Sequence, residues 1–153
     1  MLRHKSLHPL SHQHHNGLAL GVMVRRALEA DASAASAARQ SARVLDRFDL
    51  EIVNHFALEE VLLFPAIEAE LGPHDLVRTL IAEHRRLETL AARLREAPED
   101  VSTLLEFIEL LRIHIRTEEN QLFEEVQGRL SAGTLTRLGA EFEARAVRIC
   151  IEP

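Results

Sequence analysis

The sequence is short of the residue types that build several common sites. Its 153 residues include one cysteine, Cys150, and neither tryptophan nor tyrosine. A single cysteine excludes a disulfide within the chain and a cysteine-based metal cluster. There is also no glycine-rich phosphate loop, no Gly-x-Ser-x-Gly elbow and no Cys-x-x-Cys pair. The usual signatures of nucleotide binding, serine hydrolysis and thiol redox chemistry are therefore missing.

Charge and hydrophobicity exclude two classes of partner. The 24 acidic and 18 basic residues give a net charge of -6, which argues against general nucleic-acid binding. No apolar run approaches the roughly 20 residues that a membrane-spanning helix needs. Residues 1–16 are basic but lack the apolar stretch of a signal peptide. We therefore expect a cytoplasmic protein that has neither nucleic acid nor a membrane as its partner.

What the sequence does contain is a set of long helical patterns. Hydrophobic residues make up 46% of the chain, which is enough for the core of a single domain over residues 1–153. Long helices joined by short connections pack as antiparallel neighbours. We therefore predict an all-α fold: an up-down-up-down four-helix bundle over about residues 10–128 with an additional C-terminal helix. The expected helices cover residues 10–30, 34–70, 74–97, 99–128 and 133–150.

Two of these segments carry further expectations. Pro65 falls late in the second predicted helix and should kink or loosen it. The last segment, over about residues 133–150, is amphipathic. It either caps the bundle or pairs with another subunit, so a homodimer through this helix is one expected assembly.

One ten-residue phrase occurs twice in the chain. It reads HFALEEVLLF from residue 55 and HIRTEENQLF from residue 114. In each copy, and once more in the third predicted helix, a glutamate follows a histidine by four residues, so that both share one otherwise apolar helical face. The three pairs are His55/Glu59, His84/Glu88 and His114/Glu118. The stripe of the second helix reads Phe48, Ile52, His55, Glu59, Leu62 and Ala66.

Histidine–glutamate pairs that point into a core need a compensating charge. A carboxylate buried without a partner costs several kcal/mol or takes up a proton. Three such pairs directed into one core are best explained by a shared cation, and imidazole with carboxylate suits iron, zinc or manganese. We therefore predict a metal site whose ligands are His55, Glu59, His84, Glu88, His114 and Glu118.

The first helix must supply the fourth wall of this site, and two adjacent histidines compete for the role. His14 lies at the edge of the apolar side of the helical wheel, and His15 lies nearly opposite that side. We favour His14 as the ligand and keep His15 as the alternative. Gly17 and Gly21 fall on the same side as His14 and would let the backbone approach the site closely.

Less specific explanations exist for each of these residues. A single histidine on an apolar stripe is usually a core residue, and one His-x-x-x-Glu is usually an i,i+4 pair. Three such pairs, two of them within a repeated phrase, favour the metal site instead. Glu88 is the weakest candidate, since HRRLE also suits a surface edge. Glu60 and Glu119 lie roughly 100° round the helix from the ligands and should support them or face solvent.

Four segments together resemble the hemerythrin family, and specifically its bacterial cation-binding branch, the HHE domain. They read LSHQHHNGL, HFALEEVLLFP, LIAEHRRLETL and HIRTEENQLF and lie between residues 10 and 124. The resemblance implies a four-helix bundle with a non-haem centre that usually holds two irons. It also implies terminal histidine ligands and bridging carboxylates. By position these are His14 or His15, His55, His84 and His114, with Glu59 and Glu118 as the bridges.

Two positions depart from the oxygen-carrying members of that family. Where those members have a second histidine one turn after the third-helix ligand, this chain has Glu88. Their final carboxylate is an aspartate five residues after the fourth-helix histidine, whereas Glu118 and Glu119 stand here at four and five. A carboxylate-rich site favours the ferric state, so a pure oxygen-carrier role is not expected.

The ligand pattern and the resemblance lead to one main functional hypothesis and two alternatives. We expect a non-haem, di-iron protein that binds or senses O2, NO or peroxide, or that holds iron, with zinc and manganese as alternative metals. The first alternative is a di-iron redox enzyme of the peroxidase or nitric-oxide-reducing type. The second is a structural bundle with a single zinc.

Overall fold

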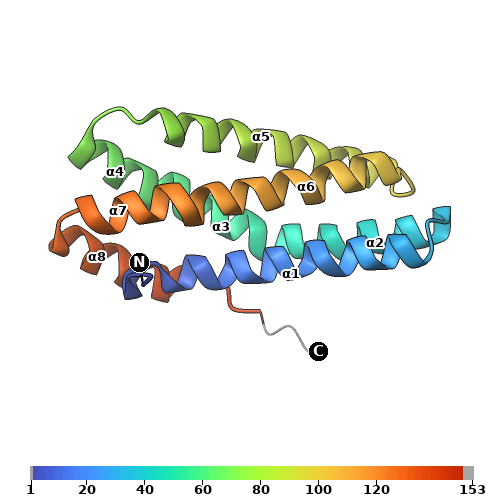
Figure 1. Cartoon of the computed structure of the whole chain (residues 1–153), viewed down its shortest axis with the longest axis horizontal. Helices are drawn as coiled ribbons and strands as arrows, with labels where there is room; N and C mark the ends of the chain where they lie inside the picture. The colour runs from blue at the N-terminus through green and yellow to red at the C-terminus, as the bar shows by residue number, and fades with distance from the viewer. Residues whose placement is uncertain (1, 150–153) are drawn as a thin grey trace.

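Four long helical rods run side by side in the computed structural model, which describes residues 2–149 (Figure 1). No strand occurs among these residues. The first rod is α1 (His8–Ala30), preceded by the 3₁₀ turn η1 (Lys5–Leu7), and the third is α5 (Asp75–Glu96). The second consists of α2 (Ala34–Arg47), η2 (Phe48–Ile52), α3 (Val53–Leu58), η3 (Glu59–Leu63) and α4 (Phe64–Leu71). The fourth consists of α6 (Val101–Thr117), η4 (Glu118–Leu122) and α7 (Phe123–Arg129), and α8 (Ala132–Arg145) follows it.

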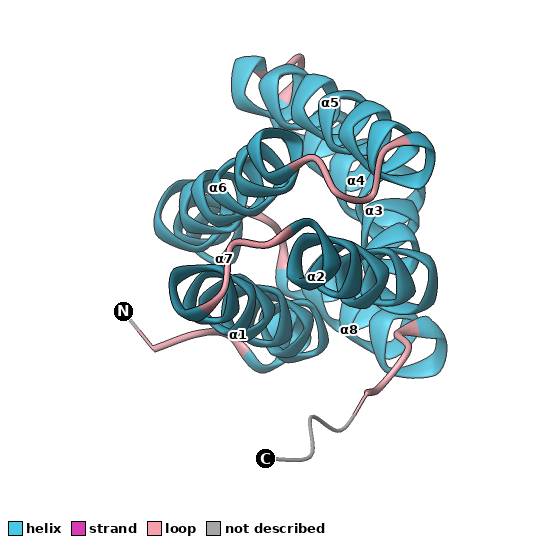
Figure 2. Cartoon of the chain, turned by 90° about the vertical axis from the view of Figure 1, so that its right-hand side faces the viewer, coloured by secondary structure: helices cyan, strands magenta, loops and turns pink. Residues whose placement is uncertain are grey.

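Consecutive rods are antiparallel and surround a common core (Figure 2). α1 packs against α2 and α6, and α5 packs against the same two helices from the other side. Short connections reverse the chain between one rod and the next. The prediction of an all-α, up-down-up-down bundle with an additional C-terminal helix is therefore confirmed.

Local signals set where the rods begin and end. Ser33, Asp100 and Ser131 each accept a hydrogen bond from the backbone N–H three residues later, at the start of α2, α6 and α8. Such N-caps satisfy N–H groups that have no partner inside the helix. Gly72 ends the second rod with a φ of 81°, a value that glycine adopts without a steric penalty.

Three stretches inside the rods are wound as π-helix, and two of them begin at predicted ligands. η3 begins at Glu59 and η4 at Glu118, so both copies of the repeated phrase widen at the same point. The wider turn rotates the residues that follow: Leu63 is fully buried, whereas Leu62 is only partly buried. Leu62 packs against the core but is not enclosed by it, because the expected stripe assumes an unbroken α-helix. Pro65 directly follows Phe64, the first residue after η3. Because η4 is widened in the same way with no proline nearby, a proline is not required for the widening.

The core consists of two apolar clusters with a polar layer between them. Along α5, Leu80 belongs to one cluster and Leu87 to the other, and the buried His84 lies between them. α1 shows the same order, since Leu10 and Leu20 belong to different clusters and the buried His14 separates them. The fold thus places buried histidines at a common height in the bundle.

The fifth helix caps one end of the bundle. Leu135, Leu138 and Phe142 of α8 are buried in the cluster at that end. The apolar face of α8 is therefore covered within the chain, as in the capping alternative, and the homodimer stays a prediction. Among the residues that the structure describes, no helix has the length and apolar character needed to cross a membrane.

α8 ends at Arg145, so the predicted helix over residues 133–150 is too long. The side chain of Asn54 explains the end, because it accepts a hydrogen bond from the Val147 N–H at 2.9 Å and donates one to the Arg145 carbonyl at 3.1 Å. Residues 146–149 continue as a non-helical segment. Cys150 lies outside the described residues.

The contact between α8 and η1 generates a stability prediction. A Cβ on Gly139 would lie 2.7 Å from Oγ of Ser6 and 3.0 Å from its backbone Cα. Relief of this contact would require the backbone at Ser6 to move, so Gly139→Ala should lower the free energy of unfolding by about 1–3 kcal/mol. Gly128→Ala is the control, because a Cβ there meets no heavy atom within 4 Å. Urea unfolding measures both, and equal stability of the two variants would contradict the packing.

Candidate metal centre

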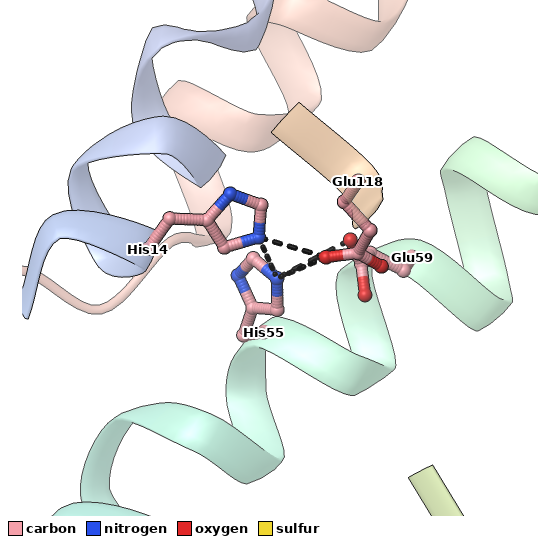
Figure 3. A group of neighbouring side chains, drawn as sticks. All are labelled: His14, His55, Glu59 and Glu118. Atoms are coloured by element: carbon pink, nitrogen blue, oxygen red, sulfur yellow. Dashed lines mark hydrogen bonds and ion pairs between the residues drawn. The ribbon is translucent and has the colours of Figure 1, made fainter. Parts of the chain in front are cut away.

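Six buried side chains meet in the polar layer, and every rod contributes at least one of them. Their potential ligand atoms form two groups of four, and within each group all atoms lie within 4.8 Å of one another. Glu59 and Glu118 belong to both groups. The first group is completed by His14 and His55 (Figure 3), and the second by His84 and His114.

Each carboxylate turns one oxygen toward each group. In Glu59, Oε1 lies 3.2 Å from Nε2 of His55, and Oε2 lies 3.2 Å from Nε2 of His84. Glu118 is arranged in the same way, with Oε2 2.9 Å from a histidine of the first group and Oε1 3.2 Å from a histidine of the second. Two carboxylates thus lie between two pairs of histidines.

These carboxylate oxygens lack hydrogen-bond donors. All four oxygens of Glu59 and Glu118 are buried, and none has a hydrogen-bond partner among the described residues. The imidazole nitrogens are close enough for an ion pair but are not aligned to donate. Because an uncompensated buried carboxylate costs several kcal/mol, the arrangement calls for a cation. Imidazole and carboxylate donors together fit a metal such as iron, zinc or manganese.

The histidine nitrogens also face each other in pairs. Nε2 of His14 lies 2.9 Å from Nε2 of His55, and the Nε2 atoms of His84 and His114 are 3.2 Å apart. A neutral imidazole whose Nδ1 carries the proton presents a lone pair at Nε2. At this distance two such lone pairs need a positive charge between or beside them, which a proton on one imidazole or a bound cation supplies. The nitrogens of each group therefore converge as metal ligands do.

The other ring nitrogen of each histidine is held from outside the two groups. An acceptor at Nδ1 fixes the Nδ1–H tautomer and leaves Nε2 available for a metal. Three of the acceptors are carboxylates and one is a carboxamide. The Nδ1 contacts are His14 to Glu119 at 2.6 Å, His84 to Glu60 at 2.8 Å, His114 to Glu83 at 2.7 Å and His55 to Gln13 at 2.9 Å.

Sequence reasoning placed two of these outer residues in a supporting role and missed the other two. Glu60 and Glu119 contact ligand histidines of other rods, as a supporting role requires. Gln13 and Glu83 are not among the predicted residues. A signal for them does exist, because each directly precedes a candidate ligand histidine and so faces the next rod.

Two of the predicted ligands, His15 and Glu88, belong to neither group. His15 is exposed on α1, and only its neighbour His14 faces the layer. The side chain of Glu88 is 41% exposed, and both of its oxygens accept hydrogen bonds from Arg85, at 2.7 and 2.8 Å. Glu88 therefore adds no carboxylate to either ligand group, and the extra stability of the ferric state expected from it is not supported by this geometry.

Phenylalanine rings hold the histidines from the apolar side. Phe56 stacks on His84 with ring centroids 3.8 Å apart, and Phe123 stacks on His14 at 5.2 Å. Packed rings restrict rotation of the imidazoles and exclude water from the layer. The histidine positions are therefore fixed by packing as well as by hydrogen bonds.

A small cavity of about 20 Å³ adjoins the first group. This volume suffices for one water-sized molecule, which needs about 10–15 Å³ on the same measure. Its walls are mostly apolar, with Glu51 as a buried carboxyl group among them, held by a 2.7 Å hydrogen bond from Asn16. The lining residues are Gln13, His14, Gly17, Glu51, Ile52, His55, Phe56, Leu111, His114 and Ile115.

In the metal-free protein, protons on two histidines offset the buried carboxylates. Burial lowers the pKa of His55, but Glu59 and Glu118 outweigh burial and raise it to about 10. Burial likewise lowers the pKa of His114, which its carboxylate neighbours, Glu118 foremost, also raise to about 10. Burial raises the pKa of Glu118, but the surrounding histidines bring it well below its usual value.

These shifts predict how stability depends on pH. A histidine with a raised pKa stabilises the fold fully below its unfolded pKa of about 6.5, and that contribution is lost as pH rises through the folded pKa. With His55 and His114 at about 10, the Tm of the metal-free protein should fall between pH 6.5 and 10, by about 5 °C or more. Zn²⁺ should remove this fall, because metal binding needs neutral imidazole.

Calorimetry of metal-free and Zn²⁺-loaded protein measures the effect. Glu118→Gln is the control, because it removes a carboxylate that raises the pKa of both histidines and should flatten the dependence. A Tm of the metal-free protein that stays constant from pH 6.5 to 10 would contradict the charge balance described above.

Comparison with known proteins gives one match. A family model described as Hemerythrin HHE cation binding domain matches residues 6–126. The matched span contains all six residues of the two groups and ends before α8. Neither the curated proteins nor the solved structures gave a match. Because the family model covers most of the chain, and because buried histidine and glutamate groups fit a cation site, the chain belongs to the hemerythrin family, as an HHE cation-binding domain.

Proposed function

We propose that this chain binds two iron ions, one in each group, and uses the pair to bind a small molecule such as O2, NO or peroxide. One observation carries the proposal: two groups of ligands share two buried carboxylates whose oxygens have no hydrogen-bond partner in the described part of the chain. Six ligands exceed the need of a single tetrahedral zinc. The shared carboxylates therefore support two ions over one.

The ligand count leaves coordination positions open if the metal is iron. Each group offers two histidine nitrogens and one oxygen from each carboxylate, which makes four donors. Four donors complete a structural zinc site, whereas iron with nitrogen and oxygen ligands takes more and so keeps positions open. When bound, iron would supply a centre that changes oxidation state and accepts a small molecule. The chain's own residues hold the ligand set in place through the four outer partners at Nδ1.

The small cavity supports binding at the first group. It adjoins both histidines of that group and one, His114, of the second. Ile52, Leu111 and Ile115 give it an apolar wall. An apolar wall excludes bulk water, and the limited volume selects molecules with two or three non-hydrogen atoms. The function that fits is therefore capture of a small diatomic molecule or peroxide.

A di-iron redox enzyme is the second candidate, and Glu51 is the observation that favours it. Peroxide reduction and nitric-oxide reduction both consume protons. Burial raises the pKa of Glu51, which keeps its carboxyl group protonated over a wider pH range beside the cavity. Multiple turnovers with peroxide or NO and an electron donor identify an enzyme, and a stoichiometric spectral change identifies a binder.

Metal stoichiometry tests the proposal. Protein purified without an affinity tag and loaded anaerobically with Fe²⁺ should hold two irons per chain. Admission of air should then produce the near-ultraviolet absorption of a diferric centre. Metal analysis and an optical spectrum, each with and without reductant, provide the measurements. Saturation at one metal per chain, whether iron or zinc, would refute the two-iron proposal.

Gly17 tests the role of the cavity. A Cβ on Gly17 would lie 2.9 Å from Cδ1 of Ile115, so Gly17→Ala should push that side chain into the cavity. We expect azide binding to the iron-loaded protein to weaken about tenfold, or ~1.4 kcal/mol, with unchanged iron content.

Gly21→Ala is the matched control for this experiment. It adds a methyl group on the same helix, 3.2 Å from Cγ2 of Ile108, but does not line the cavity. Azide titrations that give the same affinity for both variants would mean that small molecules bind elsewhere.

A further inference from the structure

The residues around one ligand group correspond pair by pair to the residues around the other, and one pair differs in charge. The repeated phrase pairs His55 with His114, Glu59 with Glu118 and Glu60 with Glu119. The other two rods extend the pairing, because Gln13-His14 in α1 corresponds to Glu83-His84 in α5. Every pair joins like residues except Gln13 and Glu83. A neutral carboxamide thus stands in one half where the other half has a carboxylate.

Both residues act on a ligand histidine through the same atom. The Nδ1–H of His55 donates to Oε1 of Gln13 at 2.9 Å, and the Nδ1–H of His114 donates to Oε2 of Glu83 at 2.7 Å. The orientation of the Gln13 amide is determined by its other contacts. Its Nε2 donates to Oδ1 of Asn54 at 2.9 Å and to the Val147 carbonyl at 3.0 Å, so only its oxygen can face His55.

The remaining outer carboxylates are balanced between the halves. Glu119, the partner of His14, forms an ion pair with Arg3 at 2.8 Å. Glu60, the partner of His84, is likewise paired with Arg85. Within residues 2–149, the only ion pair of Glu83 is the one with His114. The net difference between the two halves is therefore the negative charge of Glu83.

Glu51 does not cancel this difference. It is the other buried carboxyl group on the His14–His55 side, but it belongs to neither ligand group. Its hydrogen bond comes from Asn16 and not from a ligand imidazole. Glu51 therefore has no contact through which it could strengthen His55 as a donor in the way that Glu83 strengthens His114.

A carboxylate acceptor at Nδ1 makes the imidazole a stronger donor at Nε2, and such outer partners typically change metal affinity 10–100-fold. We propose that the two metal positions are inequivalent: the His84–His114 half binds its ion more tightly, and the His14–His55 half holds the weaker, exchangeable ion. The difference in affinity arises because the Nδ1 partner of His114 is a carboxylate, Glu83, whereas the Nδ1 partner of His55 is a neutral carboxamide, Gln13. This inference rests on the proposed two-metal site. Both histidines of the exchangeable position line the cavity, whereas of the tighter position only His114 does.

Titration of the metal-free, full-length protein with Co²⁺ tests the inference. Co²⁺ is a spectroscopic probe whose visible absorption reports each binding step, and calorimetry gives the affinities. We expect two steps whose Kd values differ by at least about tenfold. Two steps of equal affinity would overturn the inference and leave the two-metal proposal intact. Saturation at one Co²⁺ per chain would refute the two-metal proposal itself.

Variants assign each step to one half of the site. Glu83→Gln should weaken the first step 10–100-fold and bring the two steps together. Gln13→Leu removes the acceptor for His55 and should weaken only the second step. Glu96→Gln makes the same chemical change as Glu83→Gln on the same helix, at an exposed position outside the site, and should leave both steps unchanged.

The Glu83→Gln titration shows whether Glu83 creates the tighter metal position. The side chain of Glu83 is 21% exposed and glutamine has nearly the same shape, so the fold should tolerate the change. Loss of affinity in the second step rather than the first, or no change in either, would show that Glu83 does not create the tighter position. Gln13 also anchors the C-terminal segment, so the Gln13→Leu titration is interpreted together with its Tm.

Discussion

Two carboxylates with no exposed surface set the requirements for the rest of this bundle. Glu59 and Glu118 are 0% exposed, lie between two apolar clusters, and repel each other in a medium that screens charge poorly. Positive charge must therefore lie next to both carboxylates to offset their repulsion. In the metal-free protein it comes from protons on His55 and His114, and in the proposed holo form it comes from two metal ions. The same side chains thus determine both the stability of the core and its capacity to bind cations.

Much of this could be predicted from the sequence because the determinants are local and periodic. The four rods follow from long helical patterns with short connections, and the caps at Ser33, Asp100 and Ser131 are local signals. Six of the eight predicted site residues come together. Two of the three histidine–glutamate pairs enter the core as their place on an apolar stripe predicts. His14 and His15 are separated by the helical wheel, which places His14 at the edge of the apolar side and His15 nearly opposite it.

What could not be predicted depends on contacts between segments far apart in the chain. The π turns at Glu59 and Glu118 change the helical period within the repeated phrase, and Leu62, which a fixed period places on the buried stripe, is therefore only partly buried. The end of α8 depends on Asn54, 91 residues before Arg145. Glu88 has the spacing of a ligand but forms an ion pair with Arg85 on the surface, and spacing alone does not distinguish these outcomes. Gln13 and Glu83 acquire their roles only when neighbouring rods bring His55 and His114 to them.

The central claim is that two metal ions share the two buried carboxylates. Anomalous X-ray diffraction at the iron absorption edge, from crystals of the iron-loaded protein, tests it most directly. The account predicts two anomalous peaks, one beside the Nε2 atoms of His14 and His55 and one beside those of His84 and His114, with Glu59 and Glu118 in contact with both. A single peak, or a peak coordinated by His15 or Glu88, would contradict it.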